Sequence, residues 1–586
     1  MKKILIGILL CITIMSGCKK DPLDITPDGR ITLADVFTDE KRTEAYLNTV
    51  YSSIPKYFYG YFLVSFLSGC SDEAVESTRG NQEFSLAPVW NIGGLTPSYN
   101  PLAITGGPGQ GVDKDQYAAF WTGIKDANVF LANIDGAAIV TNSKNKSRFK
   151  AEAQMLRAFY YLELIKQFGP MPIIDSSFES TFDFKTLTRP GFQEVVDFIV
   201  HDCDSAIANP DLPLRLVIDA ERGRFSKAVA YAIKSEALLY NASPLWNPTD
   251  DAGKWQAAAA ASKTALAALT EGGQFALASD YGNYFMNQSD ISASPADRET
   301  IYEILARGGE HDLINFNDIP SKLCYKSGTN PSQELVDNYD MQATGEPPIS
   351  GYSDAEHLHP IINTASGYDE NDPYSGRDPR FYATVWYNNA VYDNINGEIR
   401  PLEIYAGGRE ELKKIPPNRI NTQTGYYLRK FRDPKLQVGQ DANARWKKYH
   451  LSEIYLNYAE AENEASGPVA EVYDAINTVR RRASMPNLPS ALTKEQMRER
   501  IRRERQVELA IEEHRFWDVR RWKILDQTDK VVTGMEPVKG PGNTFTYKRF
   551  VADSRSAWQD KYRIFPIPIG EVSNIPDFDL NQNPGW

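Results

Sequence analysis

Motifs that would support catalysis are absent from this sequence or incomplete. It has no HExxH zinc site and no GxSxG nucleophile elbow, and its glycine-rich stretch GGPGQGVDK has Val112 and Asp113 where a phosphate-binding loop needs lysine and a hydroxyl residue. His357 and His359 are residues of metal-ligand type, but neighbouring loop histidines are more often plain surface groups. A pair of glycosidase carboxylates is recognised only by its geometry. The motifs therefore predict no metal and no cofactor, and they leave catalysis open.

The N-terminus carries a stretch whose chemistry would be acylation of a cysteine thiol. Two lysines precede an apolar run over residues 4–15, which is shorter than the ~20 residues that a membrane-spanning helix needs. Cys18 directly follows the small pair Ser16–Gly17. This combination resembles a bacterial lipobox and predicts a signal peptide over 1–17, a lipid on Cys18 and a polar tether over 18–30. An ordinary signal peptide that contains a cysteine is the alternative.

Composition indicates a globular chain behind this N-terminus. Of the 586 residues, 42% are apolar and 24% are charged, and no later stretch approaches 18 unbroken apolar residues. The net charge of −13 argues against nucleic acid or an anionic membrane surface as a partner. Cys70, Cys203 and Cys324 permit at most one disulfide, so bridges do not hold the fold together.

Helical periodicity recurs along the chain. Apolar residues return at three- and four-residue steps in several segments, namely 149–168, 224–242, 255–270, 451–466 and 471–483. Gly169 and Gly467 end two of these patterns, and Thr493 with Gln496 has the spacing of a capping box that starts another helix. Within that last helix, Glu499 and Arg503 stand at the i,i+4 spacing of an ion pair. We expect its Trp517 and Trp522, like Trp121, to pack in the core.

The predicted fold is mainly α, a tetratricopeptide-like scaffold of helical pairs that carries long, loop-rich segments. These segments, rich in Gly, Pro, Asn and Tyr, cover 68–116, 305–332, 341–380 and 415–445. Loops of this length inside a compact domain are usually functional or disordered, and their aromatic content argues against disorder. The helices are therefore interpreted as scaffold and the loops as the working surface.

Several stretches together resemble the SusD/RagB family of outer-membrane nutrient-binding lipoproteins. They are EAQMLRAFYYLELIKQFGPMPII from Glu152, NPSQELVDNYDM from Asn330, SGRDPRFYATVWYN from Ser375, YYLRKF from Tyr426, LSEIYLNYAEAENEASG from Leu451, and RIRRERQVELAIEEHRFWDVRRWK from Arg500. The resemblance implies an N-terminal SusD-like region over 31–270 and a RagB/SusD region over 271–586, packed as one unit. It also implies a lipid-anchored outer-membrane protein, facing the cell exterior, that binds a glycan and passes it to a SusC-like TonB-dependent β-barrel transporter.

Family sites draw on loops in the N-terminal third and on the loop before NPSQELVD. A sugar offers an apolar ring face to aromatic side chains and hydroxyls to polar ones. The residues of these types in the two regions, which the resemblance implies as ligand contacts, are Asp72, Arg79, Trp90, Asn91, Tyr99, Phe316 and Tyr325. Trp90 is the leading candidate for a stacking platform. Packing of the loop itself is an equally good interpretation of each aromatic residue.

Two other functions remain open from the sequence. One is a surface glycan-binding protein that acts without a transporter, and the other is a glycan-active enzyme. The family has no known catalytic activity, which favours binding. A neighbouring barrel gene would separate the first alternative from uptake, and product release from a polysaccharide would identify the second.

Overall fold

The computed structural model describes most of the chain after residue 31. The described residues are 32–55, 66–77, 87–102, 115–138, 143–178, 181–286, 297–305, 317, 319–320, 327–395, 397–415, 420–432 and 445–586. Cys18 and the predicted tether lie outside them, as do Arg79, Phe316, Tyr325 and Cys324.

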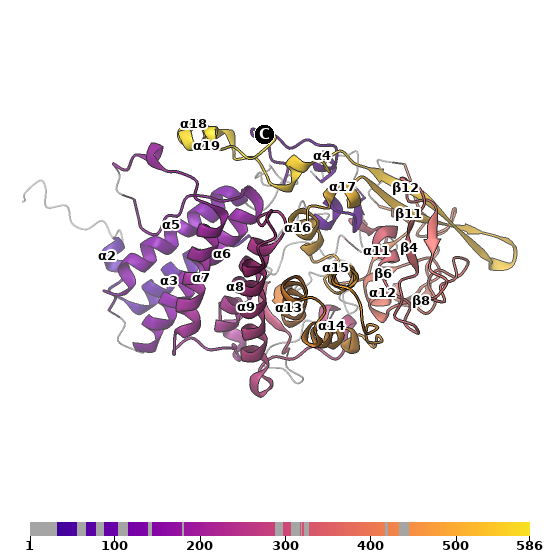
Figure 1. Ribbon diagram of the computed structural model, residues 1–586, viewed down its shortest axis with the longest axis horizontal. Coiled ribbons are helices and arrows are strands. Elements are labelled where there is room, and N and C mark those ends of the chain that lie inside the picture. Colours follow the sequence, from indigo (N-terminus) through magenta and orange to yellow (C-terminus); the bar gives the residue numbers. More distant parts are fainter. Residues whose placement is uncertain are drawn as a thin grey trace, which may run out of the picture.

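Helices dominate the described residues (Figure 1), which confirms the prediction of a mainly α fold. They are α2 (Leu33–Val36), α3 (Glu40–Tyr51), α4 (Ala87–Asn91), α5 (Gln116–Ile134), α6 (Ser143–Phe168), α7 (Phe192–Ala208), α8 (Lys227–Ala242), α9 (Ala252–Thr270), α10 (Tyr281–Met286), α11 (Gln333–Asp337), α12 (Pro379–Thr384), α13 (Leu451–Ser466), α14 (Ala470–Arg482), α15 (Lys494–Glu508), α16 (His514–Arg521), α17 (Leu525–Thr528), α18 (Ile569–Asn574) and α19 (Pro576–Leu580). Within this part of the chain, no helix combines the length and apolarity needed to cross a bilayer.

The long helices form one continuous stack. Each helix from α5 to α9 packs on the next, α13 packs on α9, and α14 and α15 pack on α13. Figure 1 shows this stack running from the left edge of the molecule to its centre, with the labelled strands on the right. The predicted helix ends are confirmed for α6 and α13, since Gly169 and Gly467 take φ values of +74° and +78°. The capping box of Thr493 and Gln496 at the start of α15 is confirmed as well.

The strands form two-stranded antiparallel pairs rather than one sheet. The pairs are β1 (Ala74–Glu76) with β3 (Thr329–Pro331), β2 (Thr300–Leu305) with β10 (Arg445–His450), β4 (Ile349–Tyr352) with β5 (Pro360–Ile362), β6 (Val385–Trp386) with β9 (Tyr427–Leu428), β7 (Val391–Ile395) with β8 (Glu398–Pro401), and β11 (Val531–Lys539) with β12 (Phe545–Ser554). Two of these pairs join segments at least 140 residues apart, because β1 meets β3 and β2 meets β10. Such non-local pairs bring distant loops to one place.

Trp90 lies in the main hydrophobic core. Its side chain is 1% exposed, and its ring centroid lies 5.6 Å from that of Phe516, 5.7 Å from Tyr562 and 5.2 Å from Phe565. The expectation that Trp90 offers an open stacking face to a sugar is therefore corrected, because both α16 and the C-terminal segment cover the indole. Trp517 and Trp522, each 4% exposed, are buried as predicted.

A cluster of buried charges joins the turn between α15 and α16 to distant segments. The Lys430 ammonium donates to the Glu512 carboxylate at 2.7 Å and to the Ala510 carbonyl at 2.9 Å. The other carboxylate oxygen of Glu512 lies 2.8 Å from Nε2 of His450, the residue that ends β10. On α15, Glu508 pairs with Arg380 at 2.9 Å and also with Arg482 of α14. We call Arg380, Lys430, His450, Arg482, Glu508 and Glu512 the buried ion cluster.

The charged side chains in this cluster shift one another's pKa values. Burial by itself lowers the pKa of His450, but the Glu512 and Glu299 carboxylates outweigh it and raise that pKa to about 10. Burial likewise opposes ionisation of Glu512, yet Lys430 and His450 lower its pKa to about 2. His450 is therefore a cation in the folded protein at neutral pH, and Glu512 is an anion.

We expect the stabilising effect of His450 to depend on pH. Because its folded pKa lies above the ordinary value of 6.5, its contribution is fully present below about pH 6.5 and is lost as pH rises through about 10. The variant His450→Gln should therefore lower the free energy of unfolding most near pH 6, and the difference from the native protein should shrink toward pH 10. Urea unfolding at several pH values measures this difference, with His201→Gln, at an exposed position of α7, as the control. A His450→Gln effect that stays constant over this range would contradict the assignment.

Candidate ligand-binding surface

The strands β1 and β3 bring together the two regions in which ligand contacts are predicted. Glu76 pairs with Thr329, and just beyond this pair the Ser77 amide donates to the Gly328 carbonyl at 2.8 Å. Arg79 follows Ser77 by two residues, and Tyr325 precedes Ser327 by two. The segment that carries Arg79 and the segment that carries Tyr325 therefore leave the described structure from adjacent backbone positions.

Gln423 and Asn317 fasten this strand pair. The Gln423 backbone amide donates to Oδ1 of Asn330 at 2.9 Å, and its side-chain amide donates to the Ser77 carbonyl. From the other side, Oδ1 of Asn317 accepts the Thr329 amide at 2.5 Å. Phe316, the next predicted contact, is the neighbour of Asn317 in the sequence. The backbone at which the predicted segments begin and end is thus held by buried amide hydrogen bonds.

Three aromatic rings connect this pair to the strands β2 and β10. The Phe66 amide donates to Oγ1 of Thr329 at 2.9 Å, and the Phe66 ring lies 5.5 Å from both Phe431 and Trp446, which are themselves 5.4 Å apart. Trp446 belongs to β10, whose first residue pairs with Leu305 at the end of β2. We call β1, β3, Phe66, Phe431 and Trp446 the loop base. The chain segments 56–65, 78–86, 306–316, 321–326 and 433–444 each begin or end within two residues of the loop base or of a residue hydrogen-bonded to it.

The backbone around the loop base includes strained residues. Phe431 has a φ of +69°, and Ile511 and Glu513, in the turn between α15 and α16, have φ values of +63° and +72°. A left-handed conformation is costly for a β-branched residue such as isoleucine, and it persists only where the surroundings enforce it. Lys430 and Glu512 of the buried ion cluster are the sequence neighbours of these residues. The contacts of Lys430 and Glu512 hold these neighbours in the left-handed conformation, next to the loop base.

Two of the predicted contact residues are buried and hydrogen-bonded to other parts of the protein, so their side chains are not exposed to a ligand. The carboxylate of Asp72, 4% exposed, accepts Nε and Nη2 of Arg515 at 2.8 and 2.7 Å. The Asn91 side-chain amide, 5% exposed, donates to the Gly69 carbonyl at 2.9 Å. The expectation that these two side chains contact a ligand is corrected, because burial and internal hydrogen bonds already occupy them.

Among the predicted contact residues that the structure describes, Tyr99 is the one whose side chain is partly exposed. Its backbone exchanges hydrogen bonds with Thr96 at 2.9 and 3.0 Å in a turn that also accepts the Ile569 amide through Pro97. Partial burial raises the pKa of the Tyr99 phenol. Tyr99 therefore lies in a turn that is hydrogen-bonded to the C-terminal segment.

Glu73 is a titratable group beside the loop base whose pKa is strongly shifted. Burial, with the neighbouring charge of Asp72, raises the pKa of Glu73 to about 8. A carboxyl group with a raised pKa is typical of general acids. Its side chain is fully buried, however, and one of its oxygens lies 3.4 Å from the Ile511 amide. Glu73 thus supports the strained turn and is shielded from any solute.

His357, a residue of metal-ligand type, has a structural partner as well. Its Nδ1 lies 3.1 Å from the Glu334 carboxylate, and its ring stacks on Tyr352 with centroids 4.2 Å apart. Over the described residues, no group of three or more potential ligands is placed to hold a metal ion.

Sequence reasoning missed the residues that position the loops. Lys430 and Phe431 come shortly before the segment 433–444, Trp446 comes shortly after it, and Gln423 lies further upstream; a positioning role was predicted for none of them. The signal present was an aromatic or basic residue close before and close after the segment 433–444, in YYLRKF and RWKKYH. Such residues tie the two ends of a loop together, which is a positioning role.

Comparisons with known proteins agree with this architecture. A family model described as the SusD family matches residues 279–586, and a second one, described as starch-binding associating with outer membrane, matches residues 108–239. SusD-like protein P2 of Formosa agariphila is 24% identical over 446 residues, which are 73% of this chain and 75% of that protein. A SusD-like protein from Bacteroides fragilis superposes with a TM-score of 0.75 at 25% identity, covering 94% of this chain and 98% of the other.

A second solved structure shows the same fold at lower identity. A SusD-like carbohydrate-binding protein from Bacteroides fragilis has a TM-score of 0.68 at 22% identity and covers 93% of this chain and 99% of its own. The first family model alone spans more than half of the sequence, over the buried ion cluster and over β3, Phe431 and Trp446 of the loop base. The chain therefore belongs to the SusD family.

Proposed function

We propose that this protein binds a glycan through the segments that leave the loop base and delivers it to a SusC-like TonB-dependent β-barrel transporter. The observation that carries the proposal is the direct pairing of β1 with β3. This pairing places the starting points of the segments with Arg79 and Tyr325 side by side. Membership of a family that includes a carbohydrate-binding protein supports the choice of ligand.

The residue types in these segments suit a sugar. Phe316 and Tyr325 supply aromatic faces for the apolar side of a pyranose ring, and Arg79 supplies several donors for its hydroxyls. Binding without catalysis is favoured because Glu73, a carboxyl with a strongly raised pKa beside the loop base, is shielded from solutes. Trp90, Asp72 and Asn91 no longer belong to the proposed site, while Tyr99 remains a peripheral candidate.

The proposed location is the outer membrane, with the protein facing the cell exterior and held by the lipid on Cys18. Stable anchoring of this kind takes two or more acyl chains, and a bacterial lipoprotein normally carries three. The second matching family model is itself described as associating with the outer membrane. A protein held in this way captures a nutrient but needs a separate pore to move it, since only closed barrels and helices span membranes.

The ligand site is tested first by removing Arg79. Loss of a charge-assisted hydrogen bond costs about 1.5–3 kcal/mol, so Arg79→Ala should weaken glycan binding roughly tenfold or more. A glycan array with the purified protein identifies a ligand, and isothermal titration then measures the affinity. Arg481→Ala, at an exposed position on α14, is the matched control and should bind as the native protein does. Equal affinity of all three proteins would exclude Arg79 from the site.

The transporter is tested by purification from native membranes. A lasting lid-and-barrel complex buries roughly 2,000 Å2 or more, so gentle detergent extraction through a C-terminal tag should recover a barrel of transporter size in near-equal amount. A tagged unrelated lipoprotein from the same membranes serves as the control. Elution of the protein alone, with glycan binding intact, would favour a stand-alone surface glycan-binding protein.

A further inference from the structure

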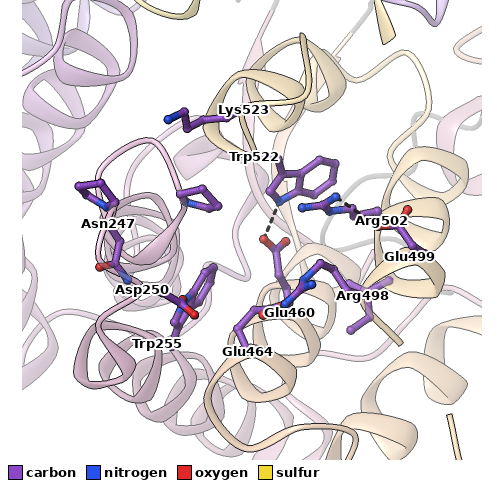
Figure 2. Close-up of a pocket in the computed structure, with 13 residues that line it drawn as sticks. Asn247, Asp250, Trp255, Glu460, Glu464, Arg498, Glu499, Arg502, Trp522 and Lys523 are labelled. Atoms are coloured by element: carbon purple, nitrogen blue, oxygen red, sulfur yellow. Dashed lines mark hydrogen bonds and ion pairs between the residues drawn. The ribbon is translucent and has the colours of Figure 1, made fainter. Parts of the chain in front are cut away.

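A cavity of about 420 Å3 lies between the α8–α9 connection and the helices α9, α13 and α15 (Figure 2). Its volume falls in the ~300–1,000 Å3 range of small-molecule sites, but the side chains of its walls are already paired. Arg498 binds both oxygens of Glu464 at 2.6 and 2.5 Å. The Trp522 indole donates to Glu460 at 2.7 Å and is 4% exposed, so it presents no open ring face. This cavity therefore offers few free groups to a ligand.

A smaller cavity, between the α7–α8 connection and β2, has a cationic lining. Its volume is about 40 Å3. Among the described residues that line it, Arg215, Arg222 and Arg224 stand against a single carboxylate, that of Glu303. A cavity needs roughly 10–15 Å3 to hold one water molecule, so this one has room for about three waters or for one compact group, and not for a sugar ring. The lining thus places an excess of positive charge around a space for one small group.

Arg215 forms no ion pair with any of the described residues, unlike the other arginines of this lining. Its Nη2 donates to the Asp297 backbone carbonyl at 2.6 Å. The Asp297 carboxylate itself binds Lys447 at 2.8 Å. Burial and the neighbouring charge of Arg298 lower the pKa of Arg215, so the guanidinium lies where a further anion would stabilise it. An arginine has five N–H donors, and most of those of Arg215 remain for a ligand.

The two other arginines hold the walls together. Nε of Arg222 donates to the Glu303 carboxylate at 2.6 Å, which ties the loop before α8 to β2. Nη2 of Arg224 lies 3.0 Å from the Glu152 carboxylate of α6. Because each of these carboxylates neutralises an arginine of the wall, neither is available to Arg215. The uncompensated charge of the cavity is therefore the Arg215 guanidinium.

The start of α8 faces the same cavity. Ser226, the N-cap residue of this 16-residue helix, lines the cavity, and its side chain makes no capping hydrogen bond. The amides of Lys227 and Ala228 already donate to carbonyls of the preceding loop. The helix therefore contributes the partial positive charge of its N-terminus and the Ser226 hydroxyl, rather than free amides.

Gly223 brings this cavity close to the loop base. It has a φ of +79°, and a Cβ added to it would lie 3.3 Å from the Leu305 side chain, so the loop before α8 lies directly against the end of β2. The segment 306–316 leaves the described structure at the residue after Leu305. Arg215 and Gly223 are partly exposed, so the cavity opens to solvent. An anion in this cavity would lie beside the root of the segment that carries Phe316.

We propose that this cavity binds a compact oxyanion, namely a sulfate, phosphate or carboxylate group, with Arg215 as its main ligand. The planar guanidinium suits two oxygens of such a group, and charge-assisted hydrogen bonds of this kind are the strong ones. The Ser226 hydroxyl and the N-terminus of α8 would supply the remaining contacts. The inference goes beyond the glycan site proposed above, since it uses none of the residues assigned there. The oxyanion is either a free inorganic ion or an acidic substituent of the glycan.

Thermal unfolding in inorganic salts tests the site. Sulfate and phosphate stabilise many proteins without binding, so each protein is compared with its own Tm in sodium chloride at equal ionic strength. Millimolar sodium sulfate or phosphate should raise the Tm of the native protein. The affinity derived from the concentration dependence should be roughly tenfold or more weaker in Arg215→Gln. Arg481→Gln, at an exposed position on α14, loses the same charge and should respond as the native protein does.

A second variant keeps the test decisive if Arg215→Gln does not fold. Arg215→Lys keeps the charge but loses the planar fork, so it should bind the oxyanion more weakly than the native protein and more tightly than Arg215→Gln. An equal response of the native protein and of the Arg215 variants overturns the proposal.

Sugar-borne anions separate the two sources. A glucose sulfate and methyl glucuronide carry the oxyanion on a sugar, and methyl glucoside is the neutral comparison. Arg215-dependent stabilisation by inorganic sulfate or phosphate alone assigns the site to a free ion. Tighter binding of a sugar-borne anion than of its inorganic counterpart assigns it to a substituent of the glycan. Equal stabilisation by methyl glucoside, or no Arg215-dependent response to any oxyanion, overturns the proposal.

Arg79→Ala separates this proposal from the proposed function. That variant should keep the full response to inorganic sulfate while its glycan affinity falls. If Arg79→Ala loses the sulfate response and Arg215→Gln keeps it, the anion binds elsewhere and this proposal is overturned. If no glycan binds at all and the Arg215-dependent response to sulfate remains, the proposed function fails and the oxyanion site stands.

Discussion

The buried ion cluster is the constraint on which the rest of this structure depends. Glu508 and Glu512, near the end of α15, are buried, and a buried carboxylate is tolerated only when paired. Their partners, Arg380, Lys430, His450 and Arg482, come from four separate parts of the chain. Removing one partner of such a pair costs about 3–5 kcal/mol, because it leaves the other charge unpaired. The cluster therefore fixes where α14, α15, β10 and the residues after β9 meet, and the strained turn at Ile511 is held in place by the same contacts.

The loop base lies directly against this cluster and divides the protein into a fixed part and a variable part. Phe431 follows Lys430, and β10 carries both Trp446 and His450, so charge pairing inside sets the positions of the aromatic rings above it. Segments that leave a rigid base can change in sequence without disturbing the core, which is how binding specificity usually varies on one fold. This arrangement accounts for a family fold that is shared at about 25% identity.

Much of the fold was predictable from the sequence, and the positions of the working side chains were not. Periodicity, the glycine stops at Gly169 and Gly467, and the capping box at Thr493 are local signals, and the structure confirms them. Glu499 and Arg503 stand at pairing distance along one helix, yet Glu499 contacts Arg502, and Arg503 reaches the Asp337 carbonyl. Trp90 and Asp72 were assigned to a ligand because their types suit one, but burial depends on distant partners such as Phe565 and Arg515. Residue type and spacing do not reveal such partners.

The central claim, that the segments leaving the loop base hold the glycan, is tested most directly by hydrogen–deuterium exchange with and without a ligand found on a glycan array. The account predicts slower amide exchange on glycan addition in peptides that cover 78–86, 306–316 and 321–326. It predicts little change in α5–α7, which pack on one another in the helical stack. Unchanged exchange in all three segments, with protection found elsewhere while the glycan is bound, would contradict the account.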